Sequence, residues 1–474
     1  MLQPVTADRP WPLFDVATTR EIEREAAAAL PPHSLMQRAG LAVARLALAV
    51  APHARTIWVA CGPGNNGGDG LEAAAHLNSW GKHVVLTLAG DPARLPADAA
   101  MSWRKCRQAG LTPSPRPPRE WDLCIDALLG IGGARALEGE LAALVQAINA
   151  GPGPVLAVDQ PSGLSGDTGT GDSVRAAHTL SLLTLKPGLF TGLGRYRCGR
   201  VWFDDLGVSL DEQRATALLS GPQPASVRPH ASHKGSYGDV AVVGGAAGMT
   251  GAAVLAASAA LHAGAGRVYL CPLAPAIDAL VAAQPELMVR DIETLPLEPM
   301  AVACGCGGGE AVADVLPRVL DQARSLVLDA DALNAIAAQP LLAQALRQRT
   351  RPTVLTPHPL EAARLLGSTA AQVQADRLRA ATTLAERFCC VVVLKGSGSV
   401  IAAPSKKPHL NPTGNARLAT AGTGDVLAGL IAALLAAGVD AFEAATAAAY
   451  RHGLAADRWP AGRTLTAGTL AKTL

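Results

Sequence analysis

The first segment able to do chemistry is GPGNNGGDG over 62–70, which directly follows the apolar run RTIWVAC over 55–61. Its glycines satisfy the GxGxxG spacing, and a helix-length segment follows. Backbone N–H groups at such a helix start attract a diphosphate, so the segment predicts a dinucleotide site, although a plain tight turn has the same glycines. Asn65, Asn66 and Asp69 are polar side chains that a phosphate cradle does not need, which favours a ligand site.

An isolated carboxylate stands in the second candidate segment. DALLGIG over 126–132 places Asp126 inside an apolar run, where an ionised carboxylate is costly unless it is paired, metal-bound or protonated. Asp126 is therefore our candidate acid or base, with a strand-end cap as the alternative. VDQPSG over 158–163 adds Asp159 and Ser162, although Ser162 could equally serve only the turn.

The third candidate segment is GTGD over 422–425, at the start of an Ala- and Leu-rich stretch. Its N–H groups can stabilise charge on a transferring phosphoryl group, while Asp425 can accept a proton from an attacking hydroxyl. Helix capping is the alternative for Asp425. His358, between two prolines, is either a ligand contact or a solvated histidine. Asp329 and Asp331 either cap a turn or stand around a magnesium ion.

Two alternations of apolar runs and helix-length segments must position these groups. The first predicts strands at 55–61, 83–89, 122–129, 154–159 and 178–185, with helices at 68–80, 95–109 and 138–150. The second predicts strands at 238–244, 267–271, 300–304, 326–329, 353–356 and 391–395, with helices at 250–264, 424–437 and 441–456. Such alternation is typical of parallel, doubly wound α/β sheets. Because ligands bind outside the carboxyl ends of these strands, Asn66, Asp126, Asp159 and Ser162 should converge in one crevice.

A polar, proline-containing stretch from Gly207 to about Lys234 separates the two alternations. A chain of 474 residues is long enough for two or three domains. We predict one domain over 1–215, with a Rossmann-like sheet, and a second α/β domain over 216–474. The two halves share no obvious repeat.

Composition excludes several classes of partner and location. The 41 basic and 39 acidic residues leave a net charge of +2 without a basic block, so we expect no nucleic acid partner. No apolar run reaches the roughly 20 residues of a membrane span, and the start lacks secretory features, so we expect a cytoplasmic location. Nine cysteines without a CxxC pair indicate neither a disulfide framework nor a zinc site, and Cys304 and Cys306 are expected to be small buried residues.

Five ordered motifs of the first half resemble the NAD(P)H-hydrate epimerase domain: SLMQRAG (34–40), CGPGNNGGDG (61–70), DALLGIG (126–132), VDQPSGL (158–164) and LKPGL (185–189). The resemblance implies a potassium ion held by Asn66, Asp126 and Ser162. It also implies that hydrated nicotinamide dinucleotide contacts Asn65, Asn66, Gly67, Gly68, Asp69, Gly130, Ile131, Gly132, Gly133, Ala134, Arg135, Ala136 and Asp159.

The second half resembles the ADP- or ATP-dependent NAD(P)H-hydrate dehydratases of the ribokinase-like superfamily, through GTGD and the motifs HKGSYGDVAVVGG (233–245), GAAVLAASAALHAGAG (251–266), LDADALN (328–334), TPHPLEAARLLG (356–367) and VVVLKGSGSVIAAP (391–404). It implies magnesium, substrate contacts at Ala252, Gly309, His358 and Asp425, and nucleotide contacts at Lys395, Gly396, Ser397, Gly398, Ser399 and Gly424. Two motifs depart from the family. Its GPGLG is GCGGG over 305–309, with Cys306 in place of proline, and its HPGE is HPLE over 358–361, where Leu360 requires φ below zero.

Together the resemblances imply a bifunctional repair enzyme. The N-terminal domain would interconvert the R and S forms of hydrated NADH and NADPH (NADHX and NADPHX), and the C-terminal domain would dehydrate the S form with ADP, giving AMP and phosphate. We also expect a homo-oligomer. One alternative is a ribokinase-type small-molecule kinase with a dinucleotide-binding regulatory domain. A second treats the N-terminal half as a non-catalytic dinucleotide sensor.

Overall fold

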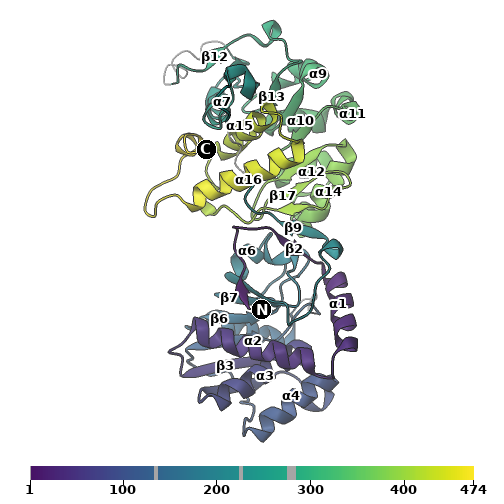
Figure 1. The fold of residues 1–474 in the computed structure, drawn as a ribbon, viewed down its shortest axis with the longest axis vertical. Helices are drawn as coiled ribbons and strands as arrows, with labels where there is room; N and C mark the ends of the chain where they lie inside the picture. Colours follow the sequence, from purple (N-terminus) through teal and green to yellow (C-terminus); the bar gives the residue numbers. More distant parts are fainter. Residues whose placement is uncertain (1, 133–136, 224–227, 275–283) are drawn as a thin grey trace. The chain divides into compact units, whose positions relative to one another are not determined.

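The protein is described by a computed structural model that covers residues 2–132, 137–223, 228–274 and 284–474 (Figure 1). The chain divides into two compact units. The first comprises Met1–Thr6 and Trp11–Leu218, and the second comprises Ala7–Pro10 and Leu219–Leu474. The N-terminal segment therefore contributes to both units, and Tyr450 of the second unit donates a hydrogen bond from its hydroxyl to the Ala7 carbonyl at 2.7 Å.

A seven-stranded sheet forms the centre of the first unit, in the order β1-β8-β7-β6-β5-β3-β4. All neighbouring strands are parallel except β1, which pairs antiparallel with β8. The strands are β1 (Gln3–Pro4), β3 (Thr56–Cys61), β4 (His83–Leu88), β5 (Leu123–Ala127), β6 (Val155–Val158), β7 (His178–Leu182) and β8 (Arg200–Asp204). The chain order reverses between β3 and β5, and such a switch point is where doubly wound sheets bind ligands.

Helices cover both faces of this sheet. They are α1 (Val16–Ala29), α2 (Ser34–Val50), α3 (Asn65–Ser79), α4 (Ala97–Gln108), α5 (Gly139–Ala150) and α6 (Gly194–Arg197). Alternate residues of β3 enter different cores: Ile57 and Val59 join the core that includes α2 and α3, whereas Trp58 joins the core that includes α5. This alternation explains why β3 is apolar along its whole length.

The second unit contains nine strands in the order β12-β11-β10-β13-β14-β15-β16-β17-β18 among its described residues. Pairing is parallel from β12 to β16 and antiparallel at β17 and β18. The strands are β10 (Asp239–Gly244), β11 (Arg267–Pro272), β12 (Met288–Val289), β13 (Ala301–Cys304), β14 (Ser325–Leu328), β15 (Thr353–Leu355), β16 (Val391–Leu394), β17 (Val400–Ala402) and β18 (His409–Leu410). Two further short strands, β2 (Trp11–Leu13) and β9 (Ala217–Leu219), stand at the sequence boundaries of the units.

Two hydrophobic cores lie on opposite faces of this second sheet. Ala241 and Val243 of β10 join the core that includes α9, α10, α11, α12 and α14, while Val240 and Val242 join the core that includes α7, α15 and α16. The helices are α7 (Thr250–His262), α9 (Val312–Gln322), α10 (Ala330–Ala338), α11 (Pro340–Gln348), α12 (Pro359–Leu366), α13 (Ala370–Ala375), α14 (Arg377–Phe388), α15 (Thr423–Ala436), α16 (Ala441–Asp457) and α17 (Ala467–Ala471).

The predicted α/β class with mostly parallel sheets is confirmed. The predicted strands and helices begin and end within two residues of the observed bounds, except at two boundaries that differ by three. Helix α3 begins at Asn65 rather than 68, so the polar residues of the glycine segment stand in its first turn. Strand β7 stops at Leu182 instead of 185, because Leu183 adopts a left-handed φ of 64° that breaks the strand. No helix in the described residues combines the length and the hydropathy needed to cross a membrane.

Candidate active sites

A cavity of about 680 Å³ opens in the first unit. Its walls come from α1, the link from α1 to α2, the first turn of α3 and the segment after β5. Of the residues predicted to contact substrate, the lining includes Asn65, Asn66, Asp69, Gly130, Ile131, Gly132 and Asp159. The predicted contacts Gly133, Ala134, Arg135 and Ala136 lie outside the described residues. The cavity therefore stands at the switch point between β3 and β5.

Asn66 and Asp159 meet at Gly130. A Cβ atom added to Gly130 would lie 3.2 Å from Asn66 Oδ1 and 3.3 Å from Asp159 Oδ2, so a side chain there would crowd both groups. The Asn66 Nδ2 atom is buried and has no hydrogen-bond partner among the described residues. Two side chains from different strand ends thus point to the same place beside the cavity.

Asp126 and Ser162 form a fully buried pair. The Ser162 hydroxyl donates to Asp126 Oδ1 at 2.6 Å, and the Ser162 backbone nitrogen donates to Oδ2 at 2.8 Å. Burial raises the pKa of Asp126 to about 6, although the two hydrogen bonds from Ser162 oppose the shift. Neither residue belongs to the cavity lining. Asp126 is therefore a carboxylate held beneath the cavity wall, and its predicted acid or base role is not established by this position.

A buried lysine that the sequence analysis missed pairs with Asp159. Lys186, only 1% exposed, donates from Nζ to Asp159 Oδ1 and to the carbonyl of Leu182 at 2.9 Å. Asp159 holds a left-handed φ of 66°, a conformation that is uncommon outside glycine but that aspartate adopts more readily than most residues. Both residues line the cavity. The LKPGL motif contained this lysine, but nothing in its sequence context distinguished an ion pair with Asp159 from a surface lysine.

Further acidic groups line the same cavity. Burial, together with the nearby carboxylates of Asp159 and Glu23, holds the pKa of Asp69 well above its usual range. Burial and Asp159 likewise raise the pKa of Glu23, a residue of α1 that the sequence analysis did not select. Carboxylates that cluster in a cavity disfavour one another's ionisation. Active sites that transfer protons commonly contain such groups with raised pKa values.

A second missed feature is a hydrogen-bond network that joins α3, α4 and the turn before α2 beside the cavity. Glu72 of α3 is fully buried and accepts hydrogen bonds from His33 Nε2 at 2.8 Å, Ser102 Oγ at 3.2 Å and Lys105 Nζ at 2.5 Å. Burial alone would raise the pKa of Glu72, but the bonds from Lys105 and His33 outweigh it and lower the value. His33 also lines the cavity, so this network fixes one of its walls.

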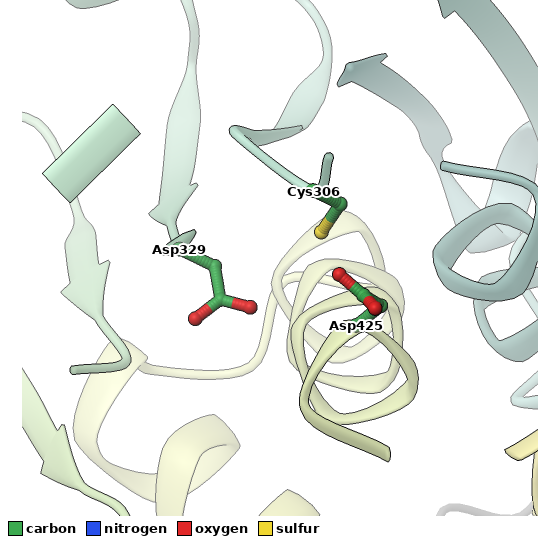
Figure 2. Close-up of side chains that lie close together, drawn as sticks. All are labelled: Cys306, Asp329 and Asp425. Atoms are coloured by element: carbon green, nitrogen blue, oxygen red, sulfur yellow. The ribbon is translucent and has the colours of Figure 1, made fainter. Parts of the chain in front are cut away.

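The second unit brings Cys306, Asp329 and Asp425 together (Figure 2). Cys306 follows β13, Asp329 follows β14, and Asp425 stands in the first turn of α15. Burial, followed by the nearby Asp329 carboxylate, raises the pKa of Asp425 to about 7. The N-cap of α15 is Gly422 and makes no side-chain cap bond, so capping does not explain Asp425.

Lys395 links the two predicted nucleotide segments. Its Nζ donates to Asp329 Oδ1 at 2.6 Å, and a Cβ atom added to Gly424 would lie 3.3 Å from that Nζ. Buried Arg377 donates to the Leu394 and Lys395 carbonyls at 3.1 and 3.2 Å, which fixes the backbone at Lys395. A fixed cation therefore stands beside the glycine turn, where phosphate groups could be stabilised.

His358 and Gly309, two further predicted contacts, are each held by hydrogen bonds. His358 is the N-cap of α12 and accepts from the Leu360 and Glu361 nitrogens at 3.1 and 3.2 Å through Nδ1. Leu360 lies in the first turn of α12, where φ is below zero, as expected for a residue with a side chain in place of the family's glycine. Asp331 Oδ2 accepts from the Gly309 nitrogen at 2.8 Å, so this carboxylate shapes the turn that contains Gly309. His358 is thus partly a capping residue rather than a freely solvated one.

Two known families match the two units. The family described as YjeF-related protein N-terminus matches residues 32–188, and the family described as NAD(P)H-hydrate dehydratase matches residues 240–474. Fold, sites and families together define a two-domain α/β enzyme acting in nicotinamide-cofactor repair.

Relatives with both parts cover nearly the whole chain. The bifunctional NAD(P)H-hydrate repair enzyme Nnr of Escherichia coli K12 is 37% identical over 92% of this chain and 88% of its own length, and that of Coxiella burnetii is 38% identical over 94% of both. The chain belongs to the family of bifunctional NAD(P)H-hydrate repair enzymes.

Other relatives match one part only. The ADP-dependent (S)-NAD(P)H-hydrate dehydratase of Neisseria meningitidis serogroup B is 44% identical over 56% of this chain and 91% of its own length. The crystal structure of the ADP/ATP-dependent NAD(P)H-hydrate dehydratase of Bacillus subtilis, co-crystallised with ATP and Mg²⁺, is 34% identical over 52% of this chain and 91% of its own, with a TM-score of 0.46.

Proposed function

We propose that the chain interconverts the R and S forms of NADHX and NADPHX in its first domain and dehydrates the S form in its second, at the expense of ADP. We propose domain ranges of 1–215 and 216–474 for these two activities. The observation that carries the proposal is that each unit has its own site at the ends of parallel strands, with carboxylates whose pKa burial raises.

For dehydration, Asp425 is the group that can accept the proton of the hydrate's hydroxyl as that oxygen attacks the terminal phosphorus of ADP. Lys395 and the N–H groups of the turn at Gly422 to Gly424 stabilise the charge that develops on the transferring phosphoryl group. AMP leaves. The phosphate ester then departs as phosphate with the carbon–oxygen bond electrons, a ring proton is lost, and the double bond returns.

Magnesium would accompany the nucleotide. Its preference for oxygen ligands fits the Asp329 and Asp331 carboxylates, which we place around the ion. Asp329 also accepts a hydrogen bond from Lys395, and Asp331 accepts one from the Gly309 nitrogen. Bound there, the ion neutralises phosphate charge. The predicted nucleotide contacts are Lys395, Gly396, Ser397, Gly398, Ser399 and Gly424, and the predicted substrate contacts are Ala252, Gly309, His358 and Asp425.

For epimerisation, we propose that Asn66, Asp126 and Ser162 hold potassium. The donor set fits a hard cation, because an amide oxygen, a carboxylate and a hydroxyl are all oxygen ligands. Positive charge there would offset the buried Asp126 carboxylate and the substrate's diphosphate. Asp126 stays our predicted acid or base. Asp69 is a second candidate, because it lines the cavity and its pKa is raised.

The test uses the S hydrate with ADP and Mg²⁺, following phosphate release and reduced-nicotinamide absorbance together. The proposal expects phosphate and reduced cofactor in equal amounts. A kinase with a regulatory domain would instead accumulate a phosphorylated product without free phosphate. Parallel reactions with ATP, and with NADHX or NADPHX, decide the donor and substrate preferences. The cytoplasmic location and the homo-oligomer stay predictions, tested by cell fractionation and light scattering.

A further inference from the structure

Cys306 lies where it can act with the two carboxylates of the dehydratase site. The sulfur of Cys306 and one oxygen each of Asp329 and Asp425 all lie within 4.8 Å of one another. Figure 2 shows the three side chains turned toward one region between the strand ends and the start of α15. Because the three residues come from three separate segments, their meeting is a product of the fold.

The Cys306 side chain is firmly positioned. It is fully buried, and its carbonyl accepts a hydrogen bond from the Gly245 nitrogen at 3.0 Å, which fixes the backbone after β13 to the end of β10. The two hydrogen bonds that Asp329 accepts from Lys395 and Thr356 both use Oδ1, at 2.6 and 2.8 Å. Its Oδ2 faces Gly424 in the first turn of α15. One oxygen of Asp329 thus remains directed toward Cys306 and Asp425.

The donor chemistry of this cluster differs from that of a magnesium site. Zinc binds cysteine sulfur at about 2.3 Å and carboxylate oxygen at about 2.0–2.2 Å, whereas magnesium requires oxygen ligands. Tetrahedral geometry at those bond lengths separates ligand atoms by about 3.3–3.8 Å. The three ligand atoms lie within 4.8 Å of one another, so a bound metal would draw them closer together. Three protein ligands would also leave the fourth position open.

The cluster places two carboxyl groups beside one cationic side chain. Two carboxylates and a thiol face one another, and Lys395, which bonds to Asp329, is the cation that contacts them among the described side chains. Burial and the nearby Asp425 and Asp329 carboxylates raise the pKa of the Cys306 thiol, so the metal-free thiol is protonated and a poor nucleophile. A bound divalent ion reverses this by stabilising the thiolate.

We propose that Cys306, Asp329 and Asp425 form a binding site for a thiophilic divalent cation of the zinc class, and that its occupation blocks the dehydratase site. Binding releases the Cys306 thiol proton to solvent and forms a sulfur–metal bond, with no change of oxidation state. The metal coordinates the Asp425 carboxylate, which then cannot accept a proton. The blocking effect rests on the proposed dehydration, whereas the binding itself does not.

Metal binding is tested first, on the full chain without nucleotide or substrate. Co²⁺ serves as the probe, because a cobalt–thiolate bond gives a near-ultraviolet charge-transfer band. The wild-type chain should show this band at one Co²⁺ per chain, and Zn²⁺ should displace the ion. Cys306→Ser should lose the band and bind Zn²⁺ at least about tenfold more weakly, since even partners beyond a metal's direct ligands contribute about 10–100-fold. Cys389→Ser is the matched control, because Cys389 is an exposed cysteine far along the chain from this cluster.

The blocking effect is tested second. Protein loaded with Zn²⁺ and passed through a desalting column is assayed in both half-reactions, and each rate is divided by the rate of the same protein without zinc. For the wild-type chain, we expect zinc to lower the dehydratase rate at least about tenfold and to leave the epimerase rate unchanged. For Cys306→Ser, we expect zinc to leave the dehydratase rate unchanged.

Absence of the charge-transfer band in the wild type, or an equal band in Cys306→Ser, overturns the site. Tight zinc binding with full dehydratase activity overturns the blocking role. A chain that binds Co²⁺ through Cys306 but dehydrates nothing even without zinc contradicts the proposed function and leaves the metal site supported.

Discussion

Ser162 donates two hydrogen bonds to one carboxylate, from its backbone nitrogen to Asp126 Oδ2 at 2.8 Å and from its hydroxyl to Asp126 Oδ1 at 2.6 Å. The two residues follow adjacent parallel strands, β5 and β6, so their meeting is set by the sheet. The pair remains buried beneath the cavity wall. This relationship suits a role in holding an ion and the cavity wall more directly than contact with the substrate.

The potassium proposal predicts that a substitution at Ser162 raises the potassium requirement of epimerisation without changing dehydration. Ser162→Ala should raise the potassium concentration needed for half-maximal epimerase rate by roughly 10–100-fold, because hydrogen bonds to charged groups contribute about 1.5–3 kcal/mol. Dehydration by the same variant serves as the internal control and should be unchanged. An epimerase rate with the wild-type potassium dependence would contradict the assignment.

The base role of Asp425 predicts that Asp425→Asn reduces dehydration by about 10²–10⁴-fold while epimerisation persists. Its folded pKa is raised to about 7, so the ionised form costs folding free energy at pH 8, and asparagine removes that cost. Thermal unfolding at pH 8 should therefore show equal or higher stability. A variant that keeps most of its dehydratase rate would remove Asp425 from the mechanism.

The pH dependence of dehydration follows from the same group. Because Asp425 must be deprotonated to accept a proton and its pKa is about 7, kcat/KM should fall about tenfold for each pH unit below 7. Asp329→Asn removes the nearby carboxylate that helps to raise this pKa and should move the acid limb to lower pH. An acid limb near the ordinary aspartate value of about 3.9 would contradict the raised pKa of Asp425.

The Glu72 network predicts a pH-dependent contribution to stability. The folded pKa of Glu72 is lowered, so its stabilising effect is present above its unfolded pKa of about 4.3 and is lost as pH falls through the folded value. Glu72→Gln should lower the free energy of unfolding by about 1–3 kcal/mol at pH 7 and by less in acid. Urea titrations at both pH values measure this difference. Equal losses at the two pH values would show that the charge does not matter.

The two units predict separable activities. A fragment of residues 216–474 should dehydrate the S hydrate, and a fragment of residues 1–215 should epimerise. The dehydratase fragment lacks Ala7–Pro10, which belong to the second unit, so we expect it to be less stable than the whole chain. Circular dichroism melts and both assays check this. Two insoluble or inactive fragments would contradict the predicted domain ranges.

The sequence predicted most strands and their polar ends, because buried parallel strands are continuous apolar runs and the glycine segments mark where they stop. It did not predict Lys186 opposite Asp159, since one lysine in a common motif carries no sign of its partner. The network of His33, Glu72 and Lys105 was also missed, because its members come from a turn and two helices and follow no spacing. Cys306 was predicted to be buried, which is confirmed. Its approach to Asp425 depends on the sheet order, which periodicity does not reveal.

The most direct test of the bifunctional account uses pure R hydrate with ADP, Mg²⁺ and K⁺, following reduced-nicotinamide absorbance. The wild-type chain should recover nearly all of the cofactor, because the first site supplies the S form to the second. Asp126→Asn and Asp425→Asn should each recover little alone, and a mixture of the two variants should restore recovery. Failure of the wild-type chain to convert R hydrate, while it still dehydrates S hydrate, would contradict the account and support a dinucleotide sensor in the first unit.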